Sequence, residues 1–315
     1  MSEFAKGTGD GPRQDLVVWG LQLDIAWENP LENVARVDAF LRQPPSSAPP
    51  DLLVLPELWS TGFTMNPAQC AEPHGGPAAL APAQHAMRRW ADATGAAVVG
   101  SIAVSTPDGF RNRLYFVPPS DSGEPSWYDK WHLFAPAGEH LHYTRPASPE
   151  EALVILRWRG WRIRLVICYD LRFPVFCRWT PAYPYDALVA VANWPAVRSA
   201  AWAALLRARA IENQCAVLGV NRVGADSSGH PHDGLSACFD AQGEVISQLD
   251  PHAAGWIAAR FDAERQQAFR MKLPFLQDGD AFSWPPFSAG ANRSANPDLP
   301  NSGTEIPRDK HPGSA

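Results

Sequence analysis

Short apolar runs rich in Val, Ile, Leu and Ala alternate along the chain with stretches in which apolar residues recur at helical spacing. Short apolar runs that are bounded by Gly, Pro or polar residues are typical of β-strands. The predicted strands are residues 16–23, 51–55, 96–104, 114–117, 152–158, 161–167, 187–192, 216–220, 234–239, 243–249 and 255–260.

Helices are predicted where apolar residues return every three or four positions. These segments are residues 31–41, 82–94, 173–179 and 199–214. In the last of them Trp202, Leu205 and Leu206 fall on one face, and Ser199 is a candidate N-cap because its hydroxyl could accept a hydrogen bond from the first turn.

The order of these elements predicts an α/β fold with mixed sheets. Strands that alternate with helices favour parallel pairing, whereas the sequence Arg157-Trp158-Arg159-Gly160-Trp161 predicts a tight turn between two antiparallel strands. Because strands outnumber helices, we expect a layered sandwich rather than a doubly wound nucleotide-binding fold.

The two ends of the chain differ from its middle. The chain has 315 residues, 45% of them hydrophobic, and we assign residues 15–287 to one domain. Residues 288–315 consist mainly of Gly, Ser, Asn, Pro and charged residues and predict a disordered tail, and residues 1–14 predict a flexible N-terminus. The glycines near the start follow no strand and therefore do not predict a nucleotide-binding loop.

Composition limits the possible partners and the compartment. The formal net charge of −6 argues against a nucleic-acid-binding protein, and no apolar run is long enough for a membrane span. Residues 1–15 contain no apolar stretch typical of a signal peptide. The five cysteines form no close pair, so we expect free thiols in a reducing cytoplasm, where one of them could be catalytic.

Candidate reactive residues follow the ends of predicted strands, where α/β proteins usually carry their sites. Glu57 follows the run that ends in Leu55-Pro56, and Cys168 follows the run Leu165-Val166-Ile167. Between them, Lys130 stands in the aromatic segment Trp127-Tyr128-Asp129-Lys130-Trp131-His132-Leu133.

Each of these residues also has an ordinary interpretation. A cysteine at a strand end is often a small core residue, a glutamate after Leu-Pro is often a solvated turn residue, and a lysine beside an aspartate is often half of a surface ion pair. Together they suit thiol chemistry on a carbonyl carbon: Glu57 could accept the proton of Cys168, and Lys130 with the backbone N–H of Tyr169 could stabilise the oxyanion.

Three segments resemble motifs of the nitrilase superfamily of carbon–nitrogen hydrolases, whose Glu–Lys–Cys triad matches Glu57, Lys130 and Cys168 in the same order. The segments are LPELWSTGF, YDKWHLF and VICYDLRFP, and the similarity extends over about residues 16–276. Within the superfamily, the words TGFTMN, GEHLHY, ANWPAVRSAAW and LLRARAIENQCAVLGVNRVG are most similar to the bacterial ω-amidase branch of the Nit-type amidases.

The resemblance implies a four-layer α-β-β-α sandwich, a homodimer or higher homo-oligomer, and a second glutamate that positions substrate and contacts the lysine, here Glu139. It also implies hydrolysis of terminal carboxamides of 2-oxo acids such as 2-oxoglutaramate and 2-oxosuccinamate, through a cysteine thioester. The scheme needs neither a metal nor an organic cofactor. Nitrilases, carbamoylases and aliphatic amidases share the triad, so these activities, and a catalytically silent binding protein of the same fold, remain alternatives.

A 2-oxo acid amide carries a carboxylate, so we expect a cation in its pocket. Arg198 is favoured over Arg172, because Arg172 could instead pair with Asp170. Aromatic and apolar residues of the same segments could form the pocket wall or simply pack in the core. They are Phe63, Met65, Trp131, Phe134 and Trp194.

Other clusters have weaker functional interpretations. His132, Glu139, His140 and His142 could imitate a metal site, but no second pair of ligands at metal spacing accompanies them. His230 and His232 are expected to face solvent, and no G-x-S-x-G word supports a serine hydrolase. The remaining cysteines are expected to be packing residues or free thiols, with Cys215 buried. They are Cys70, Cys177, Cys215 and Cys238.

Overall fold

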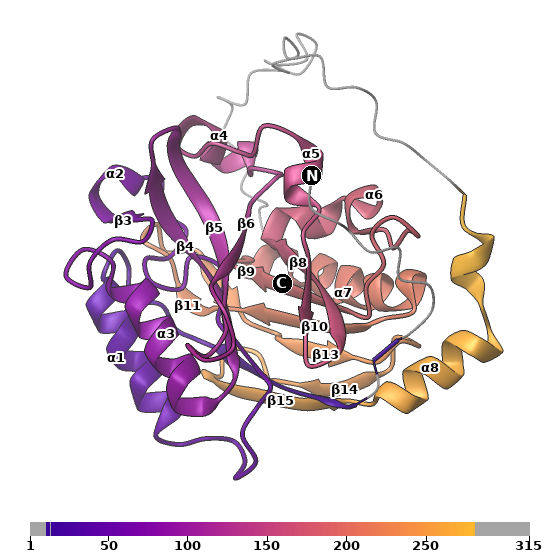
Figure 1. Ribbon diagram of the computed structural model, residues 1–315. Helices are drawn as coiled ribbons and strands as arrows, with labels where there is room; N and C mark the ends of the chain where they lie inside the picture. The colour runs from indigo at the N-terminus through magenta and orange to yellow at the C-terminus, as the bar shows by residue number, and fades with distance from the viewer. Residues whose placement is uncertain (1–10, 13, 281–315) are drawn as a thin grey trace, which may run out of the picture. The chain divides into compact units, whose positions relative to one another are not determined.

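The computed structural model describes residues 11–12 and 14–280. In this part of the chain, one sheet has the strand order β15-β1-β2-β4-β5-β6, with β3 beside β4 (Figure 1). Its strands are β1 (Leu16–Gln22), β2 (Leu52–Val54), β3 (Glu72–Pro73), β4 (Ala97–Thr106), β5 (Gly109–Val117), β6 (Ser126–Asp129) and β15 (Gly255–Phe261).

A second large sheet has the order β14-β13-β10-β9-β8-β7, and β11 pairs with β12 in a small ribbon. The strands are β7 (Ile155–Trp158), β8 (Trp161–Ile167), β9 (Ala187–Ala192), β10 (Ala216–Asn221), β11 (Val223–Ala225), β12 (Pro231–Asp233), β13 (Ala237–Phe239) and β14 (Val245–Gln248).

Both large sheets are mixed, as the sequence predicts. Strands β1, β2 and β4 run parallel to one another, as do β8, β9 and β10, and antiparallel strands flank each group. The predicted hairpin joins β7 to β8, and Arg159 and Gly160 both have positive φ angles, of 48° and 80°. Two successive positive φ angles are typical of the type I′ turns that connect antiparallel strands.

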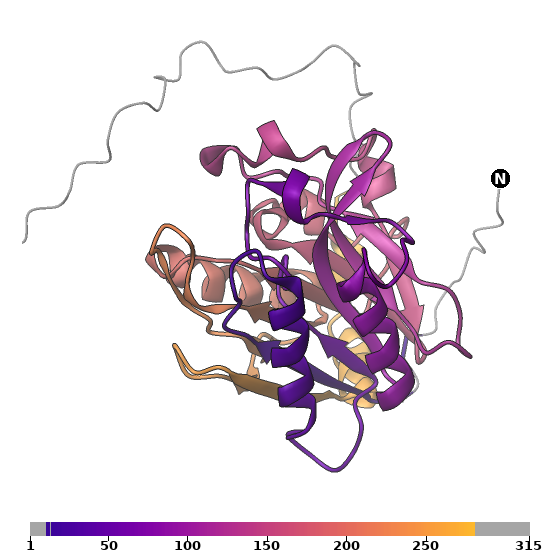
Figure 2. The ribbon, with the colours of Figure 1, turned by 90° about the vertical axis from the view of Figure 1, so that its left-hand side faces the viewer.

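Helices cover the outer faces of the two sheets, which gives the α-β-β-α order of layers (Figures 1 and 2). Helices α1 (Pro30–Leu41) and α3 (Pro82–Thr94) share a core with the first sheet, in which Val37 and Trp90 pack with Leu53. Helix α7 (Ser199–Asn213) packs on the second sheet so closely that a Cβ at Gly219 would lie 2.3 Å from Leu206.

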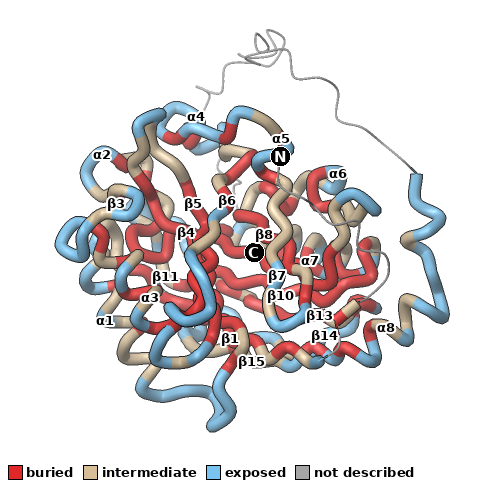
Figure 3. Tube along the Cα trace, viewed as in Figure 1, coloured by how far each residue is buried: buried red, intermediate tan, exposed pale blue. Residues whose placement is uncertain are grey.

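The inner faces of the two sheets pack against each other in a buried apolar core. A Cβ at Gly20 of β1 would lie 2.6 Å from Val220 of β10, so glycine allows the sheets to approach there. The central strands, such as β2, β9 and β10, are continuously buried, whereas the outer faces of the helices are exposed (Figure 3). Strands buried on both faces explain the unbroken apolar runs in the sequence.

Several predictions about local structure are wrong. Ser199 is not the N-cap of α7: Arg198 holds that position, and the Ser199 hydroxyl donates instead to Asp233, at 2.8 Å. The strand predicted at residues 152–158 begins only at Ile155, because Ser148 caps a short helix, α5 (Pro149–Ala152), just before it. Likewise, the strand predicted at 234–239 begins at Ala237.

The sequence patterns gave no prediction for several short elements and one longer helix. These elements are α2 (Pro67–Cys70), β3, α4 (Glu139–His142), α5, β6, β11, β12 and α8 (Ala263–Lys272), and the helix predicted at 173–179 is the single turn α6 (Pro174–Cys177). None of the helices in the described ranges is long and apolar enough to cross a membrane. The predicted tail, residues 288–315, lies outside the described residues, as does most of the predicted flexible N-terminus.

Candidate active site

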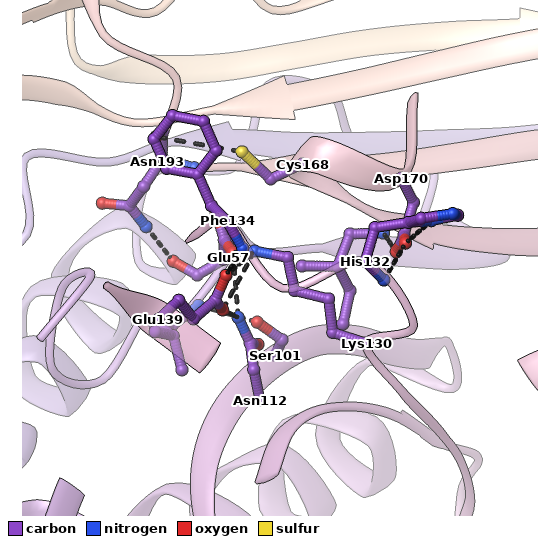
Figure 4. Close-up of polar contacts among 12 residues, drawn as sticks. Glu57, Ser101, Asn112, Lys130, His132, Phe134, Glu139, Cys168, Asp170 and Asn193 are labelled. Carbon is purple, nitrogen blue, oxygen red and sulfur yellow. Dashed lines mark hydrogen bonds and ion pairs between the residues drawn. The ribbon is translucent and has the colours of Figure 1, made fainter. Parts of the chain in front are cut away.

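The ends of strands from both large sheets converge on one cluster of polar side chains (Figure 4). Glu57 lies three residues beyond β2, and Lys130 directly follows β6, both in the first sheet. Cys168 directly follows β8 and Asn193 directly follows β9, both in the second sheet. The interface between the sheets therefore brings together residues that are far apart in the sequence.

Lys130 binds two carboxylates in a fully buried cluster. Its Nζ lies 2.8 Å from Glu57 Oε1 and 3.0 and 2.9 Å from the two carboxylate oxygens of Glu139, and all three side chains are 0% exposed. Burial alone would lower the pKa of Lys130, but the charges of Glu139 and Glu57 outweigh it and raise that pKa. The ammonium therefore keeps its proton at any physiological pH.

Glu139, which the resemblance singled out, lies in this cluster at the start of α4. Besides Lys130, its carboxylate accepts a hydrogen bond from the backbone N–H of Phe134. Burial raises the pKa of Glu139, and the nearby charge of Glu57 adds to this, while Lys130 lowers it. Two carboxylates that share one ammonium in a buried site repel each other.

Glu57 is fixed by donors from several elements. The backbone N–H of Asn193 donates to its Oε2 at 2.9 Å, and the side chain of Asn112 donates to its Oε1 at 2.9 Å. The amide of Asn193 also donates to the backbone carbonyl of Glu57, and the next N–H, of Leu58, donates to the Ser101 hydroxyl at 2.7 Å. These bonds hold a carboxylate whose side chain is wholly removed from solvent.

Cys168 begins a short 3-10 helix of residues Cys168–Arg172, and its φ of 46° is rare for a residue with a side chain. The residue as a whole is half-buried, and its sulfur lies 4.0 Å from the carbonyl oxygen of Asn193. Desolvation and the negative charge of Glu57 raise the pKa of Cys168 well above its ordinary value, and Lys130 offsets part of this. Tyr169 is the second residue of the helix, where backbone N–H groups have no partner within the helix.

Asp170 connects the 3-10 helix that begins at Cys168 to the segment that follows Lys130. Its carboxylate accepts hydrogen bonds from the backbone N–H and ring Nδ1 of His132, from the Tyr128 hydroxyl, and from the backbone N–H of Ile167. These bonds outweigh the effect of burial and lower the pKa of Asp170. The ring of His132 also stacks on Phe173, with the ring centroids 3.6 Å apart.

The predicted ion pair between Arg172 and Asp170 is wrong. The guanidinium of Arg172 lies over the ring of Trp194, 4.7 Å from its centroid, while Asp170 binds the partners just described. Arg198 lies over Phe134 at 5.3 Å, and its carbonyl accepts a hydrogen bond from the indole of Trp194. Across the described ranges neither arginine forms an ion pair, and both are partly exposed.

The predicted wall residues take different positions. Phe134 contacts Tyr169 edge to face at 5.0 Å, and Phe63 lies 5.2 Å from the Lys130 ammonium, so both border the cluster. Trp194 is buried beside both arginines. Met65 is half-buried, whereas Trp131 is buried and its ring faces the guanidinium of Arg145.

The histidine cluster does not assemble. His132 binds Asp170 and Glu139 binds Lys130, while His140 and His142 are exposed. Among the described residues, no group of three His, Cys, Asp or Glu side chains is placed to hold a metal ion.

The remaining histidines and cysteines are separate from the cluster. His230 is exposed, but the prediction that His232 faces solvent is wrong, since His232 is buried and its pKa is lowered to about 4 by burial and by Arg222. Cys177, Cys215 and Cys238 are free and buried, and Cys70 is free and half-buried.

Asn112 and Tyr128 belong to the site although the sequence reasoning did not identify them. Asn112 lies on the same face of β5 as Leu114 and Phe116, and all three residues are buried. A polar residue in an apolar row of a strand is a signal for a buried polar network, and this signal could have identified Asn112.

Comparison with protein families gives one match over most of the described chain. A family model described as carbon–nitrogen hydrolase matches residues 20–271. Two similar relatives are the ω-amidase YafV of Yersinia enterocolitica, 43% identical over 83% of this chain and 96% of that protein, and the 2-oxoglutaramate amidase of Bacillus subtilis, 32% identical over 82% of this chain and 95% of that protein.

Solved structures show the same fold. A carbon–nitrogen hydrolase superfamily protein of Xanthomonas campestris, solved with an arsenic adduct in its active site, superposes with a TM-score of 0.78. It is 35% identical and covers 86% of this chain and all of that one. Nit3 of Saccharomyces cerevisiae, a member of the nitrilase superfamily, gives a TM-score of 0.71 at 20% identity over 85% of this chain and 97% of that one.

Proposed function

The chain belongs to the carbon–nitrogen hydrolase family, and we propose that it is an ω-amidase that hydrolyses the terminal carboxamide of 2-oxo acids such as 2-oxoglutaramate and 2-oxosuccinamate. The observation that carries the proposal is the buried Glu57–Lys130–Glu139 cluster beside the thiol of Cys168. The names of the similar relatives supply the substrate class.

Cys168 is the proposed nucleophile and Glu57 the proposed base. Because its pKa is raised, the thiol is protonated at rest and needs a neighbouring group that takes its proton during attack. The charge of Glu57 acts on this thiol and raises its pKa. As the sulfur bonds to the amide carbon, the proton moves to Glu57.

Lys130 and the N–H of Tyr169 are the proposed oxyanion donors. An ammonium has three N–H groups; one serves Glu57, one is shared by the two oxygens of Glu139, and the third is left for the oxyanion. Fixed donors of this kind stabilise the tetrahedral intermediate without rearrangement. The carbon–nitrogen bond then breaks, and Glu57 returns its proton to the departing ammonia.

The remaining thioester is hydrolysed by water. Glu57 takes one proton from the water as its oxygen attacks the thioester carbon, the carbon–sulfur bond breaks, and the thiol regains a proton. The products are ammonia and the dicarboxylic 2-oxo acid. Every acid and base step in this cycle uses a side chain of the cluster.

The substrate carboxylate would bind the guanidinium of Arg198, with Arg172 as a second candidate. Arg198 lies over Phe134, which itself contacts Tyr169 next to the nucleophile. A guanidinium without an ion-pair partner in the described part of the chain is free to bind a carboxylate through two hydrogen bonds. Phe63, Phe134 and Trp194 are proposed walls of the pocket, with Met65 at its margin.

We also propose that the protein is a cytoplasmic homodimer. The family resemblance supports the dimer, and five free cysteines support a reducing compartment. Light scattering coupled to size-exclusion chromatography tests the dimer, which requires about twice the 34.4 kDa mass of one chain.

The function is tested by ammonia release from a panel of 2-oxoglutaramate, 2-oxosuccinamate, glutamine, asparagine, an N-carbamoyl amino acid and a simple nitrile. We expect the wild type to favour the 2-oxo amides, Cys168→Ala to release none, and Cys70→Ser to match the wild type. Faster release from the nitrile or the carbamoyl compound contradicts the substrate class, and an active Cys168→Ala variant contradicts the nucleophile.

A further inference from the structure

Asn112 lies behind the catalytic cluster, on the side away from Cys168 (Figure 4). It is buried at 1% exposure in the middle of β5. Its amide nitrogen donates to Glu57 Oε1 at 2.9 Å and to Glu139 Oε1 at 3.1 Å. Both N–H bonds of one amide are therefore used to join two carboxylates.

The same residue also holds the lysine. The backbone N–H of Lys130 donates to the carbonyl oxygen of Asn112, at 3.0 Å. Asn112 thus contacts the proposed base, the second glutamate and the chain that carries the ammonium. The side-chain amide is oriented with its nitrogen toward both carboxylates, because a carboxylate accepts hydrogen bonds. The flipped orientation would place the oxygen, Oδ1, against the two carboxylates.

Electrostatics explains why such a bridge is needed. Glu57 and Glu139 both contact Lys130, so two negative charges share a single positive charge in a fully buried site. Like charges at this distance either move apart or bind a proton, and both changes remove Glu57 as a base. An amide that donates to each carboxylate holds them together without adding a charge.

We propose that Asn112 is a positioning residue that holds Glu57 beside Glu139 and Lys130 and directs its other oxygen, Oε2, toward Asn193 and the thiol. This proposal rests on the proposed function, because it assigns Asn112 a role in the same reaction. Glu57 Oε1 accepts from both Lys130 and Asn112, while Oε2 accepts from the backbone N–H of Asn193, whose carbonyl lies beside Cys168.

Two variants test this role. Asn112→Leu keeps the approximate shape and removes both donors, and Asn112→Asp keeps the shape more closely and places a third carboxyl group in the cluster. We expect kcat for 2-oxosuccinamate to fall about 100-fold in both, with KM changed less than about threefold, since a misplaced base affects the chemical step more than binding. Asn213→Leu, which removes another buried asparagine at the end of α7, is the matched control.

A second readout does not depend on turnover. The rate at which iodoacetamide alkylates Cys168 is measured against pH by intact mass, in a Cys70→Ser background. The charge of Glu57 raises the pKa of the Cys168 thiol, so a Glu57 that is no longer held in place in Asn112→Leu raises it less, and the midpoint of this profile moves to lower pH. The ionisable groups that face the cluster are Glu57, Glu139, Lys130, Cys168 and Tyr143.

The outcomes separate this proposal from the proposed function. If the wild type releases no ammonia from any amide, the function fails, and the alkylation profile still tests Asn112. If the wild type is active but both Asn112 variants keep its kcat or its alkylation midpoint, the positioning role is overturned. A fall in thermal stability with an unchanged midpoint, as expected for Asn213→Leu, also overturns it, because a purely structural role predicts that result.

Discussion

His132 donates two hydrogen bonds to one oxygen of Asp170, from its backbone N–H at 2.9 Å and from its ring at 2.8 Å. His132 follows Lys130 by two residues, and Asp170 follows Cys168 by two. This pair therefore fixes the proposed oxyanion donor relative to the proposed nucleophile. The other oxygen of Asp170 accepts hydrogen bonds from the Tyr128 hydroxyl, at 2.6 Å, and from the backbone N–H of Ile167. Asp170 therefore also joins the residues that precede Lys130 and Cys168.

Asp170→Asn is expected to destabilise the protein and to slow the reaction. Asparagine keeps the shape but removes the charge and replaces one acceptor by a donor facing other donors. Removing one partner of a buried charged network costs about 3–5 kcal/mol. Urea unfolding measures this loss, and Asp226→Asn, which affects an ion pair with the exposed His230, should cost less than about 1 kcal/mol. Equal losses in both variants contradict the connecting role.

The stabilisation by Asp170 should disappear in acid. The folded pKa of Asp170 lies below the ordinary aspartate value of 3.8, so the ionised form is favoured in the folded state. A lowered folded pKa gives stability that is fully present above the unfolded value and is lost as the pH falls through the folded one. We expect the difference in unfolding free energy between wild type and Asp170→Asn to be constant from pH 7 to 5 and to shrink below about pH 4. A difference that grows in acid contradicts this assignment.

Lys130→Met should leave the two glutamates without their cation. We expect a loss of roughly 3–5 kcal/mol in unfolding free energy together with loss of activity, because two buried carboxylates then repel each other. The double variant Lys130→Met, Glu139→Gln should recover much of the stability, since one negative charge is removed, but no activity. Calorimetry and ammonia release measure the two effects, and a double variant less stable than Lys130→Met contradicts the charge balance.

The sequence could predict the layers and the three proposed catalytic residues, because these depend on local patterns. The three proposed catalytic residues each follow a β-strand and lie in a recognisable sequence motif; they are Glu57, Lys130 and Cys168. The bounds of β8, β9 and α3 agree with those predicted from the spacing of apolar residues. The prediction of mixed sheets, which is confirmed, rests on the same apolar runs and on the Arg159-Gly160 turn.

Contacts made across the two sheets could not be predicted in this way. Two arginines interrupt the apolar pattern around Asn112, so the predicted strand began only at Leu114, and the partners of Asn112 come from remote segments. The orientation of the Asp170 side chain depends on Tyr128 and His132, which precede it in the sequence by 42 and 38 residues. Because Arg172 is only two residues from Asp170, the sequence predicts an ion pair between them. The 3-10 turn instead directs Asp170 to His132 and Arg172 to Trp194.

Arg198→Ala should separate substrate recognition from catalysis. We expect KM for 2-oxosuccinamate to rise about 10- to 100-fold, the effect of losing one charge-assisted pair, while kcat and KM for an uncharged amide stay nearly the same. Arg172→Ala provides the comparison, because its guanidinium also lies on an aromatic ring, that of Trp194, which in turn holds the carbonyl of Arg198. If Arg172→Ala raises KM for the anionic substrate and Arg198→Ala does not, the carboxylate binds at Arg172. Equal changes for charged and uncharged amides in both variants contradict a carboxylate site at either arginine.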